Sequence, residues 1–386
     1  MDFYQSLMAQ ASALAPQSIL NQLIEQLRTE RDHAGLFQAL LLQARARLGL
    51  PLVLPTGDTS KHIPAAQQEP YEEAIRQAAR TVGQLFLEDG DVAQAWPYFR
   101  LIGETAPVQA YLESIQEPSE EEWPTLLALA WQEGVHPLLG FKWILEQRGL
   151  CNAITTLTQS HLSPEQRQAC VVRLLEALHR ELVERLQYDL AQKGLVLAEP
   201  SMPLPDLLAA HPQLGQAEEY HIDLSHLSSV LEMALELPPG PALSLALELS
   251  QYGAVLNPRF QPNNEPPFEQ GYRAFVHFFQ ILVGTKAEEG LAYFRDRAEQ
   301  AKADQASTSP GEVLVHLLFH LGRYEEALSA YQTYLSQAEP RQLRCPSLAE
   351  ISLRLGNFQS WQDWSRAHHE PVPFVTALLL SKQKNV

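Results

Sequence analysis

Apolar side chains recur every three or four residues along most of the chain, the spacing that places them on one face of an α-helix. Between Ser18 and Leu48, for example, Leu20, Ile24 and Leu27 follow this pattern. It predicts a largely helical protein. In the N-terminal part, helices are expected from Asp2 to about Ala13, from Ser18 to Leu48 with a break near Asp32, from Glu69 to Glu88 and from Val92 to Ile102.

The longest apolar stripe begins after Ser163 and continues through leucines to Leu190. Ser163 is a suitable helix cap, and Pro164 suits the first helical turn. Lys193 and Gly194 end the pattern. A helix of about 30 residues spans roughly 45 Å. The stripe therefore predicts one long helix, which we expect to bridge two halves of an array of helices.

Proline-rich stretches interrupt the helical pattern at residues 50–68, 195–216 and 253–268, and predict loops there. Loops as long as the last one are usually functional or disordered. Phe260 and Phe268 lie in it, so we expect it to pack on another part of the protein. A small-ligand pocket beneath this loop is one interpretation. It is favoured if both phenylalanines line a cavity instead of filling a core.

A glycine, a small residue and an aromatic residue recur at fixed offsets. Ala327 follows Gly322 by five positions and Tyr331 follows Ala327 by four. The glycine permits the left-handed turn that ends one helix, the small residue lets the next helix approach closely, and the aromatic ring fills the gap beneath the following hairpin. The same offsets occur in Gly90, Ala95 and Phe99, and looser copies in Gly134/Leu139/Trp143, Gly284/Gly290/Phe294 and Gly356/Trp361.

Leu321-Gly322-Arg323-Tyr324-Glu325-Glu326-Ala327 with Tyr331, together with Gly90/Ala95/Phe99, resembles the tetratricopeptide-repeat (TPR) family. The resemblance is good over residues 310–340 and fair over 75–105 and 270–303. It implies an all-α protein, a right-handed α-solenoid of stacked helical hairpins with divergent repeats, to which the long bridging helix is added.

Composition agrees with helices, because Val, Ile and Thr are sparse between residues 70 and 350 whereas Leu, Ala, Gln and Glu dominate. The patterns together divide the chain into four segments. These are an N-terminal helical segment and loop (1–68), degenerate TPR-like hairpins (69–160), the long helix with an irregular helical region (161–268), and C-terminal TPR-like hairpins (269–386).

The net charge is −18, and the sequence has no run rich in lysine and arginine. Nucleic acids and anionic membrane surfaces are therefore not expected as partners. We expect no signal peptide and no transmembrane helix, because the sequence lacks the apolar runs that both require. Three widely spaced cysteines suit reduced thiols. The expected location is the cytoplasm.

In the TPR family, the first helix of each hairpin lines the concave face of the solenoid. Counting back from the hairpin glycines gives a polar groove of mixed charge, which suits a peptide or a charged tail better than an apolar helix. The resemblance therefore implies a non-catalytic scaffold or adaptor that binds a protein or peptide, and leaves self-association through the repeat ends open. The expected groove residues are Arg80, Gln84, Trp131, Glu312, His316, His320, Glu350 and Arg354.

Two histidine clusters carry an alternative, a metal site. His221, Asp223 and His226 offer imidazole and carboxylate ligands within six residues, a set that suits Zn²⁺ or Fe²⁺ if another group such as His211 or His277 joins it. The alternative function is then a metal-dependent enzyme or a metal-binding sensor. A simpler interpretation is that Asp223 caps a helix. Glu312, His316 and His320 also share a helix face, without the His-Glu-x-x-His pattern of zinc proteases.

Motifs for other chemistry are missing from the sequence. It has no Gly-x-Ser-x-Gly nucleophile turn, no phosphate-binding Gly-x-x-x-x-Gly-Lys-Ser/Thr loop and no Gly-x-Gly-x-x-Gly stretch. An α/α-barrel enzyme would show similar helix pairs, and paired catalytic carboxylates cannot be selected from 46 acidic residues without geometry. Whether the protein is an enzyme thus stays open, and the patterns favour a binding protein.

Overall fold

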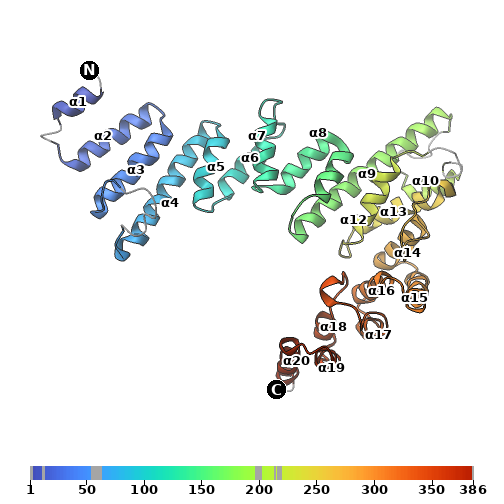
Figure 1. The fold of residues 1–386 in the computed structure, drawn as a ribbon. Coiled ribbons are helices and arrows are strands. Elements are labelled where there is room, and N and C mark those ends of the chain that lie inside the picture. Colours follow the sequence, from blue (N-terminus) through green and yellow to red (C-terminus); the bar gives the residue numbers. More distant parts are fainter. Residues whose placement is uncertain are drawn as a thin grey trace. The chain divides into compact units, whose positions relative to one another are not determined.

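The computed structural model describes residues 3–10, 14–53, 63–195, 202–212, 214 and 220–384. Within these ranges every regular element is a helix. The chain forms two compact units, Met1–Trp143 (unit 1) and Ile144–Val386 (unit 2). The α-helices of each unit are labelled in Figure 1. The predicted helical class is therefore confirmed for the described part of the chain.

Unit 1 consists of helices that differ in length, and α8 (Pro137–Thr158) begins in unit 1 and continues into unit 2. Within α8, Gly149 has φ 75° and interrupts the helical backbone. The other helices are α1 (Phe3–Gln10), α2 (Pro16–Thr29), α3 (His33–Leu48), α4 (Ala65–Glu88), α5 (Val92–Leu101), α6 (Ala106–Ser114), α7 (Trp123–Leu127) and the π-helix η2 (Ala128–Gln132).

Local caps and close approaches explain the helix boundaries in unit 1. The predicted break near Asp32 is confirmed, since the Asp32 carboxylate accepts from the Gly35 amide at 2.8 Å and begins α3. Gly90, with φ 81°, turns the chain between α4 and α5. Ala95 on α5 is fully buried, as the repeat pattern predicted. The hydrophobic core of this region is continuous from Val92 to Trp143.

Unit 2 contains the longer series of helices. They are α9 (Pro164–Gln192), α10 (Leu204–Ala210), α12 (Leu224–Ala234), α13 (Ala242–Val255), η3 (Pro258–Phe260), α14 (Tyr272–Val283), α15 (Ala287–Ala303), α16 (Ser309–His320), α17 (Tyr324–Tyr334), η4 (Pro340–Gln342), α18 (Leu348–Leu355), α19 (Gln359–Ala367) and α20 (Pro371–Lys384). From α12 to α20 each α-helix packs on the next, and α14 also contacts α16.

The predicted long helix is α9, of 29 residues. Ser163 caps it in a capping box with Gln166, which satisfies backbone groups at both positions. Its leucines, among them Leu182 and Leu190, are fully buried, and the helix packs on α12 and α13. Helix α9 lies wholly inside unit 2, so it does not connect the two units. That it bridges two halves of a repeat array stays a prediction.

The hairpin that carries the family resemblance forms as predicted. Gly322 has φ 72° between α16 and α17, Ala327 is fully buried and Tyr331 is 2% exposed. In the neighbouring hairpin, a Cβ on Gly290 would lie 2.9 Å from the carbonyl oxygen of His277. The small residue at this position therefore sets how closely α15 approaches α14.

The long loop begins later than predicted. Helix α13 continues to Val255, so Gly253 lies inside a helix. A Cβ on Gly253 would lie 2.7 Å from ring carbons of Tyr272, the first residue of α14. Glycine is thus used there for close helix packing, and the connection to α14 spans residues 256–271.

Other predictions fall partly outside the described residues. These are the start and end of the first helix, and much of the loops at 50–68 and 195–216.

None of the described helices combines the length and apolar character needed to cross a lipid bilayer. The three cysteines are free thiols, with Cys151 exposed, Cys170 buried and Cys345 partly buried.

Candidate ligand-binding pocket

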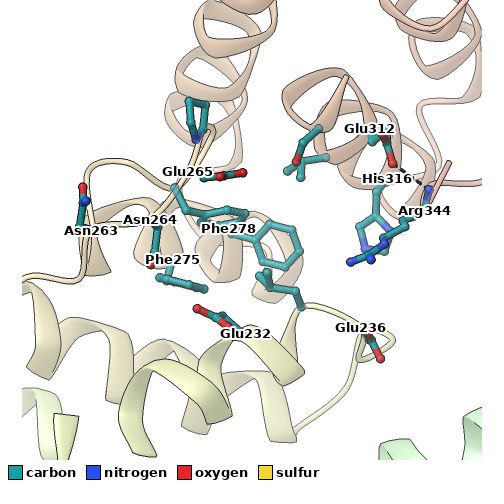
Figure 2. A pocket seen from close by; sticks show the side chains of 15 residues that line it. Glu232, Glu236, Asn263, Asn264, Glu265, Phe275, Phe278, Glu312, His316 and Arg344 are labelled. Carbon is teal, nitrogen blue, oxygen red and sulfur yellow. Dashed lines mark hydrogen bonds between the residues drawn. The ribbon is translucent and has the colours of Figure 1, made fainter. Parts of the chain in front are cut away.

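A pocket of about 730 Å³ lies in unit 2, among α12, the loop before α14, α14 itself, α16 and the segment before α18. Figure 2 shows its side chains converging from these segments. The volume is within the range of small-molecule and side-chain sites in proteins, roughly 300–1,000 Å³.

Three phenylalanines form the floor of the pocket. Phe275 and Phe278 are separated by three positions on α14, so both project from one face of the helix. Phe268, from the loop, stacks on Phe275 with ring centroids 4.7 Å apart and lies 6.0 Å from Phe278. All three rings are largely buried. Their packing makes the floor apolar and fixes the end of the loop against α14.

The expectation that the long loop packs on another part of the protein is confirmed for both of its phenylalanines. Phe268 contacts α14, and Phe260 meets Tyr220 edge to face at 5.2 Å. Only Phe268 lines the pocket. The condition set for a ligand pocket beneath this loop is therefore met by one phenylalanine and not by the other.

Glu232 on α12 and Glu265 in the loop face the pocket without a compensating cation among the described residues. Desolvation raises the pKa of the Glu232 carboxyl, because it lies beside apolar neighbours although the residue as a whole stays exposed. Glu236 also lines the pocket, but Arg167 pairs with it at 3.1 Å. Two uncompensated carboxylates thus lie close to the phenylalanine floor (Figure 2).

Glu312 on α16 organises the opposite side. One of its carboxylate oxygens accepts from the Thr308 hydroxyl at 2.7 Å, and the other accepts from the backbone amide of Arg344 at 2.8 Å. The second bond ties the segment before α18 to α16. It engages only the main chain of Arg344, whose guanidinium forms no ion pair within the described part of the chain. Figure 2 shows the Arg344 side chain next to His316.

His316 lies between the phenylalanine floor and Arg344. Its ring stacks on Phe278, with centroids 6.0 Å apart and planes 16° apart, and lies 4.4 Å from the His320 ring. Its Nε2 atom is buried and has no hydrogen-bond partner among the described residues. Burial, with a smaller contribution from His320, lowers the pKa of His316 to about 4. The imidazole is therefore neutral at pH 7.

Of the predicted groove residues in unit 2, Glu312 and His316 line the pocket. His320 contacts His316 but is not part of the lining. Glu350 instead completes a capping box at the start of α18, accepting from the Ser347 amide at 2.8 Å. Arg354, on the same helix, is exposed and lies outside the pocket.

The predicted groove residues of unit 1 have local roles. Arg80 pairs with Glu104 at 2.6 Å and with Glu73 at 3.6 Å. Gln84 is exposed and donates to Glu88 on the same helix. Trp131 lies on the π-helix η2, is half-buried, and packs on Phe141 with ring centroids 6.0 Å apart.

The side chains proposed as metal ligands make other contacts. Asp223 caps α12, accepting from the amides of Ser225 at 2.8 Å and His226 at 3.4 Å. The His221 ring lies between the Tyr252 hydroxyl at 3.2 Å and Asp189 at 3.3 Å. Throughout the described ranges, no three His, Cys, Asp or Glu side chains are grouped so that they could hold a metal ion.

Several pocket residues were not predicted from the sequence. The repeat pattern gave no reason to select Glu232, Glu265 or Arg344, which come from α12, a loop and an inter-helix segment. The length of the loop before α14 was the one useful signal. Phe275 and Phe278 have the spacing of any buried helix face, so nothing in the sequence distinguishes them from core residues.

No family model, curated protein or solved structure matches the chain.

Proposed function

We propose that this protein is a non-catalytic, TPR-like scaffold or adaptor, which binds a partner protein through a short basic peptide segment held in the pocket of unit 2. The observation that carries the proposal is the pair of uncompensated carboxylates, Glu232 and Glu265, beside the floor formed by Phe268, Phe275 and Phe278. The packing of each helix on the next from α12 to α20, and the contact of α14 with α16, supports stacked hairpins. We propose that these hairpins form a right-handed solenoid.

Lysine and arginine side chains match this combination of surfaces. Each has an apolar stem that packs on aromatic rings and a charged head that remains near polar groups. The head would pair with the carboxylates, and proximity to the phenyl rings adds a cation–π contribution of about 0.5–1 kcal/mol at an exposed site. The net charge of −18 adds long-range attraction for a basic partner, which weakens as salt is added.

The test measures binding of fluorescent peptides with one central lysine, by anisotropy at low and high salt. The variant Glu232→Gln/Glu265→Gln removes both charges and keeps the side-chain shapes. We expect its affinity to fall about tenfold, since two ion pairs of about 0.7 kcal/mol each add to about 1.4 kcal/mol. A matched control is Glu325→Gln/Glu370→Gln, which removes two exposed charges outside the pocket. Equal affinities for both double variants would refute the proposed site.

A further inference from the structure

Arg344 is an exposed residue on the pocket wall, and its side chain forms no ion pair among the described residues. Two other arginines of unit 2, Arg295 and Arg297, pair with carboxylates at 2.7 Å. Arg344 has its backbone fixed by Glu312, while its guanidinium keeps all of its donors available on the pocket wall. Because this cation lines the pocket beside His316, it is placed to pair with an anionic group supplied by a ligand.

His316 complements Arg344. Its ring is held by stacking on Phe278, and its buried Nε2 lacks a partner within the described residues. A buried polar atom without a hydrogen bond is destabilising, so a ligand that supplies the missing partner would gain affinity. Because the imidazole is neutral at pH 7, it can donate one N–H to a ligand carboxylate without adding charge. Arg344 and His316 thus lie together at one end of the pocket, where they can bind an acidic side chain.

The two ends of the pocket differ in charge. Figure 2 shows Glu232 and Glu265 on either side of the Phe275 and Phe278 rings, and His316 with Arg344 beyond Phe278. A ligand carrying only positive charge would satisfy the carboxylates but place like charge near Arg344. A ligand carrying both signs would satisfy both ends, and this arrangement disfavours purely basic competitors.

We infer that the pocket selects a bipolar peptide segment, in which a lysine or arginine binds Glu232 and Glu265, an acidic side chain binds Arg344 and His316, and apolar groups between them cover the phenylalanine floor. This inference rests on the proposed function and adds the second charge requirement to it.

The experiment uses the full chain and a set of end-capped peptides with one lysine and one glutamate separated by about two to four residues, a range that allows for about 3.3 Å per extended residue. Matched peptides replace the glutamate by glutamine or by lysine. Affinities are measured by anisotropy for wild type, Arg344→Gln, Arg344→Glu and the control Arg354→Gln, which changes an exposed arginine outside the pocket.

We expect the bipolar peptide to bind wild type about tenfold more tightly than its glutamine counterpart. Arg344→Gln should abolish this preference, and Arg344→Glu should reverse it, so that the two-lysine peptide binds more tightly than the bipolar one. Arg354→Gln should behave as wild type.

The outcomes separate the two proposals. If the peptides bind, and if Glu232→Gln/Glu265→Gln weakens them while the Arg344 variants leave the preference unchanged, the bipolar ligand is wrong and the basic-peptide site stands. If no peptide of the set binds, or if the carboxylate variant binds as tightly as wild type, the proposed function itself is overturned.

Discussion

The imidazole of His316 stacks on the phenyl ring of Phe278, with their planes 16° apart and the histidine Nε2 buried without a partner in the described part of the chain. The contact places a titratable ring against an apolar floor, where its charged form is disfavoured. The consequences extend to stability as well as to binding.

Stability should decrease at acid pH because of His316. In the unfolded chain a histidine binds its proton near pH 6.5, whereas burial lowers the pKa of His316 to about 4 in the folded protein. Between these values the unfolded form binds more protons, so the free energy of unfolding falls as pH falls, by up to about 3 kcal/mol from this group. Urea denaturation of wild type and His316→Gln at several pH values measures this.

The His316→Gln variant should show a flatter dependence of stability on pH in that window, whereas His161→Gln, at an exposed position, should follow wild type. Parallel curves for wild type and His316→Gln would show that the imidazole is not desolvated in the folded protein.

Binding of a basic peptide should release protons near pH 5. The raised pKa of Glu232 leaves part of its carboxyl protonated there, and an approaching lysine favours the carboxylate. Affinity should therefore fall as pH falls from about 7 to about 5. Calorimetry in two buffers with different ionisation enthalpies measures the released protons. Glu232→Gln should reduce the number released, and identical heats in both buffers for wild type would contradict the expected desolvation of Glu232.

Gly253→Ala should destabilise unit 2 and weaken peptide binding. The added Cβ would lie 2.7 Å from ring carbons of Tyr272, which is 1% exposed and has no space to move away. Overpacking of this kind costs typically 1–3 kcal/mol, although alanine itself favours a helix. Tyr272 begins α14, so Phe275 and Phe278 would shift with it. Gly240→Ala, whose Cβ would have 3.8 Å to its nearest neighbour, should stay within about 0.5 kcal/mol of wild type in chemical denaturation.

Substitutions at Asp223 distinguish a helix cap from a metal ligand. A cap needs only an oxygen acceptor, so Asp223→Asn should retain stability and Asp223→Ala should lose about 1 kcal/mol. Thermal melts with and without added zinc provide the measurement. A zinc-dependent increase in Tm for wild type that disappears in Asp223→Asn would instead support the metal site.

Much of the local structure was accessible from the sequence. The offsets of Gly322, Ala327 and Tyr331 predicted a turn and two buried positions, because left-handed backbone and close helix packing each restrict the residue type strongly. The cap at Ser163 was equally clear, since side-chain capping depends on residues only three positions apart.

The site was less accessible, for physical reasons. Helical spacing placed Glu312 and His316 on one face, but the groups opposite them depend on tertiary packing. Arg344 reaches the pocket because its backbone amide donates to Glu312. The segment around Arg344 has no helical spacing, so this contact cannot be predicted from the sequence. At Trp131 a π-helix shifts the positions of side chains around the axis, so counting at 3.6 residues per turn does not predict its face.

The Glu312 carboxylate accepts hydrogen bonds from both Thr308 and Arg344. The residues that line the pocket lie as far apart in the sequence as Glu232 and Arg344. Any fragment used to isolate the binding activity must therefore retain this whole stretch. A fragment that ends after α17 would keep Phe275, Phe278 and His316 and lack the guanidinium. Such a fragment would be expected to bind basic peptides with little regard for a neighbouring acid, and so to misreport the selectivity of the intact protein.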